Sequence, residues 1–159
     1  MIIVEFGEYY KKIEITPEDQ VKFDNLLEIA RSICPEDIEQ IFISTSPGED
    51  NQTIPGDLWF FSESYIVNFP AEAVKSGSPE MFLIPLNIRW LKIYYSNYDF
   101  KKASNDSTLD VVVDFKGHPF GENFSRSTLR TFSFNCDNLR EIIKDYLKPN
   151  FINWIYSSL

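Results

Sequence analysis

Residues 56–70 read GDLWFFSESYIVNFP, and this stretch decides the fold because two runs of strand-forming residues flank a short polar linker. Residues 58–61 and 65–69 are rich in the aromatic and branched side chains that fit a pleated surface. The linker SES suits a three-residue hairpin connection. The sequence therefore predicts two antiparallel strands here. Because both faces of the first run are bulky, we interpret its aromatic rings mainly as core.

Further strands are expected on both sides of this hairpin, joined mostly by short polar turns. Strands with short connections pair antiparallel, because parallel pairs need long crossovers. In LDVVVDF, apolar residues alternate with Asp110, Val112 and Asp114, which predicts a half-buried strand. The other strand candidates are residues 41–44, 81–86, 88–96 and 129–135.

Two helices are predicted, one before and one after these strands. The first spans TPEDQVKFDNLLEIARSIC, with Thr16 as N-cap, Pro17 at the first helical position and Pro35 as the stop. The second closes the chain, and Pro149 is expected to break or kink it. Its apolar stripe consists of Leu139, Ile142, Ile143, Tyr146 and Leu147.

The N-terminal stretch MIIVEFGEYYKKIEIT is interpreted as a β-hairpin with a tight turn at Gly7–Glu8. In its second arm, Tyr9, Ile13 and Ile15 share one face by the two-residue period. The start lacks a basic segment before the apolar run, so we expect no signal peptide and a cytoplasmic location.

Seven antiparallel strands followed by an amphipathic helix can form a small barrel plugged at one end. This order of elements resembles the pleckstrin-homology-like (PH-like) superfold, in its bacterial PH/GRAM type, over residues 38–148. The resemblance lies in GDLWFFSESYIVNF, FLIPLNIRWLKIYYS, LDVVVDF and RTFSFNCDNLREIIKDYL. The expected fold class is α+β, in one domain of 159 residues. Residues 1–37 are expected to form a hairpin-and-helix addition, residues 38–148 the seven-stranded barrel with its closing helix, and residues 149–159 a helical extension.

Charge is distributed unevenly along the chain. Residues 1–80 contain 16 Asp and Glu against 5 Lys and Arg, whereas residues 81–159 contain 8 against 10. The formal charge is therefore −11 for residues 1–80 and +2 for residues 81–159, which gives a net charge of −9 for the chain. Such a field repels nucleic acid and attracts a basic partner. An acidic composition of this kind is also expected if the charge serves only to keep the protein soluble and marks no binding partner.

Motifs for catalysis or for a metal are absent from the sequence. His118, the single histidine, has no recognisable nucleophile beside it, and it forms no zinc set with Cys34 and Cys136. The two thiols are expected to be reduced, although a disulfide is left open. No glycine pattern for phosphate or dinucleotide binding occurs, so no cofactor is expected.

The function expected from these features is a non-enzymatic interaction module whose acidic N-terminal half docks a basic protein, with inhibitor- or immunity-like proteins as one sub-case. Reversing Glu49 and Asp50 to Lys should then weaken binding without unfolding the protein. Aromatic anchors within a charged rim suit such an interface. The expected contact residues are Glu36, Asp37, Glu39, Glu49, Asp50, Asp57, Trp59 and Phe61.

Two other functions remain as alternatives. The first is a membrane-surface or lipid-headgroup module, although the PH-like resemblance implies basic residues after the first strand, where this chain is acidic. The second, weaker alternative is an enzyme that uses His118. A homodimer through a strand edge is also left open. The basic residues available to a membrane module are Lys101, Lys102, Lys116, Arg126 and Arg130.

Overall fold

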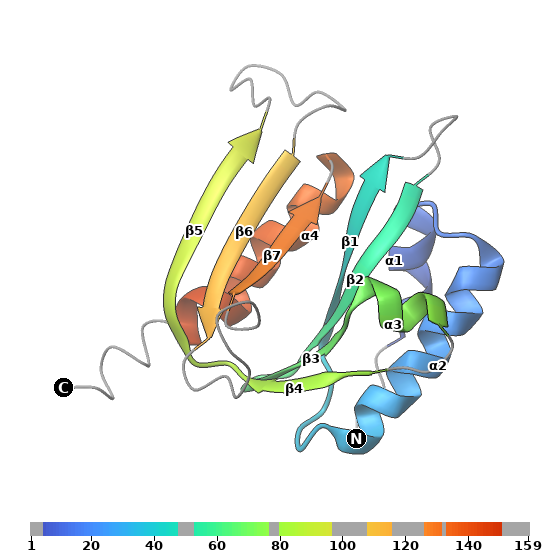
Figure 1. The fold of residues 1–159 in the computed structure, drawn as a ribbon, viewed down its shortest axis with the longest axis horizontal. Coiled ribbons are helices and arrows are strands. Elements are labelled where there is room, and N and C mark those ends of the chain that lie inside the picture. Colours follow the sequence, from blue (N-terminus) through green and yellow to red (C-terminus); the bar gives the residue numbers. More distant parts are fainter. Residues whose placement is uncertain are drawn as a thin grey trace. The chain divides into compact units, whose positions relative to one another are not determined.

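The computed structural model describes residues 5–47, 53–76, 80–96, 108–115, 126–131 and 133–150. The chain forms two compact units, Met1–Leu83 and Ile84–Leu159, and each is described by itself (Figure 1). Both units combine helices with antiparallel strands, so the predicted α+β class is confirmed.

A four-stranded sheet in the order β1-β2-β3-β4 belongs to the first unit, except that the last two residues of β4 lie past its boundary. The hairpin predicted around SES is present, because β2 (Thr53–Phe61) pairs antiparallel with β3 (Tyr65–Phe69). β1 (Gln40–Pro47) pairs with the other side of β2, and β4 (Phe82–Pro85) forms the far edge. β1 and β2 are longer than the strands predicted at 41–44 and 58–61.

Helix α2 (Pro17–Ile33) begins and ends as the sequence predicts. The Thr16 hydroxyl accepts a hydrogen bond from the Asp19 backbone N–H at 3.2 Å, which satisfies one free donor of the first turn. The helix ends at Ile33, before Pro35. The short helix α3 (Ala71–Ser76) follows β3 and was not predicted.

The predicted N-terminal hairpin is wrong in its described part, because Gly7–Lys12 form helix α1. Phe6, Tyr10 and Ile13 are buried, and their spacing places them on one side of a helix. The Tyr10 ring packs against Phe23 of α2, with ring centroids 5.8 Å apart. Packing against α2 therefore favours the helical interpretation of a stretch whose pattern also fits a strand.

Helix α1 ends in a left-handed residue that is not glycine. Glu14 has a φ of 60°, and its N–H donates to the Lys11 carbonyl at 3.1 Å. The Ile15 N–H donates to the Tyr10 carbonyl at 3.0 Å. This pair of bonds is the Schellman arrangement, in which glycine normally occupies the left-handed position.

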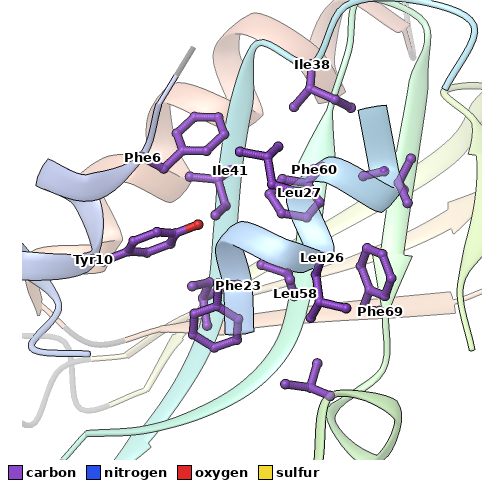
Figure 2. Close-up of a cluster of buried hydrophobic side chains, with 14 of the residues drawn as sticks. Phe6, Tyr10, Phe23, Leu26, Leu27, Ile38, Ile41, Leu58, Phe60 and Phe69 are labelled. Carbon is purple, nitrogen blue, oxygen red and sulfur yellow. The ribbon is translucent and has the colours of Figure 1, made fainter. Parts of the chain in front are cut away.

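The core of the first unit lies between the helices and one face of the sheet (Figure 2). Side chains from α1, α2 and three strands meet there, so the amphipathic stripe of α2 buries against the strands. The residues labelled in the close-up are Phe6, Tyr10, Phe23, Leu26, Leu27, Ile38, Ile41, Leu58, Phe60 and Phe69.

The second unit contains the antiparallel sheet β5-β6-β7, followed by a helix. The strands are β5 (Ile88–Ser96), β6 (Thr108–Phe115) and β7 (Arg126–Thr131). Helix α4 (Ser133–Ile142) contacts β6 and β7. The strand predicted at 129–135 is therefore wrong after residue 131, since α4 already begins at Ser133.

A π-helical turn, η2 (Ile143–Leu147), continues α4, and residues 148–150 remain helical. The Lys148 N–H donates to the carbonyl of Ile143, five residues earlier. Pro149 has no N–H, and its ring would clash with the carbonyl four residues earlier in a regular helix. The wide turn therefore accounts for how the helix passes Pro149 instead of breaking there.

The described strands form two separate sheets, so the closed seven-stranded barrel predicted from the sequence is not present. Pro85 ends β4 and has no N–H to donate to a ladder. The Asn87 N–H then bonds the Pro85 carbonyl at 2.8 Å, which turns the chain sharply before β5.

Candidate functional site

The acidic residues proposed as a contact surface occupy different structural positions. Asp37 and Glu39 are exposed in the linker between α2 and β1, and Glu36 is half-buried beside them. Glu49 and Asp50 lie outside the described residues.

Hydrogen bonds hold this linker against the β2–β3 turn. The Ser64 N–H donates to Oε2 of Glu36 at 2.9 Å, and the Glu39 N–H donates to the Phe61 carbonyl at 2.8 Å. Exposed Glu63 lies in the same turn. The contacts therefore gather four acids, which we call the acidic corner: Glu36, Asp37, Glu39 and Glu63.

Ser62 fixes the turn beneath the acidic corner. Its fully buried hydroxyl accepts the Tyr65 N–H at 3.0 Å and lies 3.2 Å from the Tyr65 carbonyl oxygen. The Cys34 thiol, half-buried and free of a disulfide, lies 3.6 Å from the same hydroxyl. The Cys136 side chain lies outside the described part.

Asp57 is half-buried and caps a helix with one oxygen of its carboxylate. Gly56 and Asp57 together face Ser44 in a β-bulge of β2. A Cβ on Gly56 would lie 3.3 Å from the Ser44 carbonyl oxygen, so a larger residue would crowd the bulge. Oδ1 of Asp57 accepts the N–H of Ala71, the first residue of α3, at 2.7 Å.

Burial raises the pKa of Asp57 above its ordinary value of 3.8, while the bond from the Ala71 N–H acts in the opposite direction. Burial is the larger effect. The folded protein therefore favours the neutral form of this carboxyl more than the unfolded chain does.

The aromatic pair of the opening stretch lies in the interior. Trp59 is 2% exposed and Phe61 is fully buried, which agrees with the interpretation of these rings as core. Neither ring is available at the surface of this structure to anchor a partner.

Sequence reasoning missed a polar site on β5. Arg89 is an extra residue in that strand, because Ile88 pairs with Phe115 and Trp90 already pairs with Asp114. The Arg89 guanidinium contacts Oδ2 of Asp114 at 2.9 Å. The alternation in LDVVVDF placed Asp114 on the polar side of its strand, but the residue is only 5% exposed.

Most residues named for the other functional classes lie outside the described part of the chain. No group of three or more His, Cys, Asp or Glu side chains there is arranged to hold a metal ion. His118, Lys101, Lys102 and Lys116 lie outside the described residues. Arg126 and Arg130 belong to strand β7, not to a loop as expected.

A search for membrane spans among the described helices finds none that is long and apolar enough to cross a bilayer. In the comparisons with known proteins, no family model, curated protein or solved structure matches the chain.

Proposed function

We propose that the protein is a non-enzymatic interaction module whose acidic N-terminal unit docks a basic protein partner. The observation that carries this proposal is the agreement between the charge division and the structural division. Residues 81–83 are uncharged, so the unit Met1–Leu83 has a formal charge of −11 and Ile84–Leu159 has +2. A field of one sign over one unit attracts a partner of the opposite sign and speeds association.

The acidic corner is the part of this unit best suited to contact. Residues 32–74 contain eight Asp and Glu and no Lys or Arg. Asp37 and Glu63 are exposed and have no ion-pair partner within the described residues. By contrast, Glu28 on α2 is paired with Arg31 at 2.6 Å. Within the described chain, the carboxylates of Asp37 and Glu63 are therefore exposed members of the corner that no described cation neutralises.

The corner is also held in place before a partner arrives. The bonds from Ser64 to Glu36 and from Glu39 to Phe61 tie both segments to the buried sheet. A rigid surface loses less conformational freedom on binding than a mobile one does, which favours affinity. Inhibitor- or immunity-like proteins that bind a basic target are one sub-case of this proposal.

The PH-like resemblance also remains a proposal. The order of a four-stranded sheet, a three-stranded sheet and a closing helix supports it. Helix α3 between β3 and β4 and the lack of barrel pairing in the described strands depart from it.

Affinity capture from a lysate of the native host tests the proposed function. The tagged full chain should retain a basic protein in stoichiometric amount at low salt and release it at high salt, because salt screens exposed charges. Capture of a neutral or acidic protein, or retention unaffected by salt, would contradict the proposal.

A further inference from the structure

The β5 bulge presents a polar pair whose two members differ in exposure. The Arg89 side chain is 48% exposed, whereas the Asp114 side chain is only 7% exposed. Because Arg89 is the extra residue of the bulge, its side chain departs from the regular alternation of the strand. Bulges commonly direct a side chain in this way beside a functional site.

The pair leaves one buried acceptor without a partner. Oδ2 of Asp114 contacts the guanidinium, but Oδ1 is closed to solvent and has no hydrogen-bond partner within the described chain. A buried carboxylate oxygen without a donor is costly, so native structures seldom retain one without a reason. The guanidinium, for its part, has five N–H donors, more than one carboxylate oxygen can accept.

We propose that Arg89 and Asp114 form a binding site for a carboxamide group, such as the side-chain amide of Asn or Gln in a peptide. A carboxamide offers an N–H donor for Oδ1 of Asp114 and a carbonyl acceptor for the Arg89 guanidinium. Half-buried Trp90, the ladder partner of Asp114, adds a flat apolar surface beside the pair.

Charged ligands fit the same pair less well. The Arg89–Asp114 pair itself is formally neutral, and Arg126 of β7 is the other ladder partner of Asp114. A carboxylate meets the like charge of Asp114 and supplies no donor, and a metal cation meets the guanidinium. A neutral group with both a donor and an acceptor uses both members of the pair.

A ligand reaches Oδ1 only if a side chain moves. Arg89 is half-exposed on an edge strand of its sheet, so its guanidinium can swing toward solvent while the ligand enters. The site lies in the second unit, away from the acidic corner in the sequence. It therefore does not depend on the proposed docking of a basic partner.

Two matched peptides test the proposal on the ¹⁵N-labelled full chain. Titration with N-acetylglutamine methylamide should shift the Arg89 Nε–H and Trp90 indole N–H signals. The peptide N-acetylglutamate methylamide replaces the primary side-chain amide by a carboxylate and keeps only trans backbone amides, whose N–H and carbonyl point in opposite directions. It should bind at least about tenfold more weakly.

Substitutions then assign the preference to the pair. Asp114→Asn should abolish or reverse the glutamine preference, because its amide N–H₂ donates where the carboxylate accepted. Arg89→Gln should weaken both peptides, and this variant serves as the test if Asp114→Asn unfolds. Asp137→Asn is the matched control, since exposed Asp137 pairs with Arg140 on α4 at 3.1 Å. It should change neither affinity.

Three results would overturn the proposal. These are a glutamine peptide that shifts neither signal, equal affinity for the two peptides, and a preference that survives Asp114→Asn.

Discussion

Each unit carries an aspartate at a β-bulge, and the two aspartates differ in how completely the chain satisfies them. In the first unit, Asp57 accepts the N–H of Ala71 and thereby caps α3. In the second, Asp114 binds Arg89 with one oxygen and leaves the other without a partner in the described chain. The same backbone irregularity thus accompanies a carboxylate that caps a helix in one unit and a carboxylate with one buried, unpartnered oxygen in the described part of the other.

This comparison indicates how a bulge aspartate can be assigned to structure or to binding. A carboxylate whose hydrogen bonds are supplied by its own chain stabilises the fold. A buried carboxylate with an unused oxygen stabilises the fold less, and its remaining capacity is available to a ligand.

The largest effect is expected from Arg89→Ala, which leaves the Asp114 carboxylate buried without a charge partner. Removing one partner of a buried ion pair costs about 3–5 kcal/mol of unfolding free energy. Because the Arg89 guanidinium is half-exposed, we expect a loss of about 3 kcal/mol or less for this pair. Chemical denaturation of the wild type and the variant measures the loss. A change below about 0.5 kcal/mol, the usual range for a surface substitution, would show that the pair is not a buried one in solution.

Asp57→Ala should cost about 1–2 kcal/mol, because it removes the cap of α3. Asp57→Asn keeps an acceptor and should be near wild type at neutral pH. If Asp57→Ala were as stable as the wild type, the closed contact at this bulge would be refuted.

Asp57 should also make stability depend on pH with a definite sign. Because folding raises its pKa, the folded protein binds more protons than the unfolded chain. The stabilising contribution of the Asp57 carboxyl group is present below pH 3.8 and is lost as the pH rises through its raised pKa in the folded protein. Relative to Asp57→Asn, the wild type should therefore become less stable as the pH rises above 3.8. An opposite slope in paired denaturation curves would contradict the role assigned to burial.

Two adjacent tyrosines of α1 repeat the contrast on a smaller scale. The Tyr9 hydroxyl accepts the N–H of Ile43 on edge strand β1 at 3.0 Å, whereas the buried Tyr10 hydroxyl lies near the Asp24 carboxylate without a hydrogen bond of full geometry in the described chain. Tyr9→Phe should cost about 1 kcal/mol, and Tyr10→Phe should be neutral or slightly stabilising. Thermal unfolding of both variants measures this difference, and equal losses would break the comparison.

Burial, with the nearby Asp24 charge as the next cause, raises the pKa of Tyr10 above its ordinary value of 10.0. The phenol therefore stays neutral at physiological pH, and the comparison of the two variants concerns hydrogen bonds alone.

The smallest effect is expected at the end of α1. Glu14 adopts a left-handed conformation that costs a residue with a Cβ about 1–2 kcal/mol, whereas glycine adopts it freely. Since glycine also makes the unfolded chain more flexible, Glu14→Gly should stabilise by only about 0.5–1 kcal/mol. A loss of stability, measured in the same denaturation assay, would argue against the left-handed helix end.

Local signals in the sequence predicted some elements well. Thr16, Pro17 and Pro35 mark the ends of α2, and the SES linker marks the β2–β3 hairpin, because caps and turns depend on neighbouring residues alone. Helix α1 was mispredicted as a strand because a stretch of only six residues fits both the two-residue repeat of a strand and the 3.6-residue repeat of a helix. Its contact between Tyr10 and Phe23, which favours the helix, is visible only in the fold.

The candidate sites were predicted less completely, for a related reason. The acidic linker and turn could be named from composition, but Asp57 proved to be a helix cap, because a bulge sets the direction of its side chain. The pair of Arg89 with Asp114 depends on a one-residue register shift, which no period in the sequence reveals.

The central claim, docking through the acidic corner, is tested most directly by the affinity of the captured partner for two charge-matched variants. Asp37→Lys with Glu63→Lys alters the corner, and Glu5→Lys with Glu80→Lys makes the same charge change at exposed positions elsewhere in the unit. Isothermal titration should show at least about tenfold weaker binding for the corner variant than for its control. Equal affinities in the two folded variants would contradict the account.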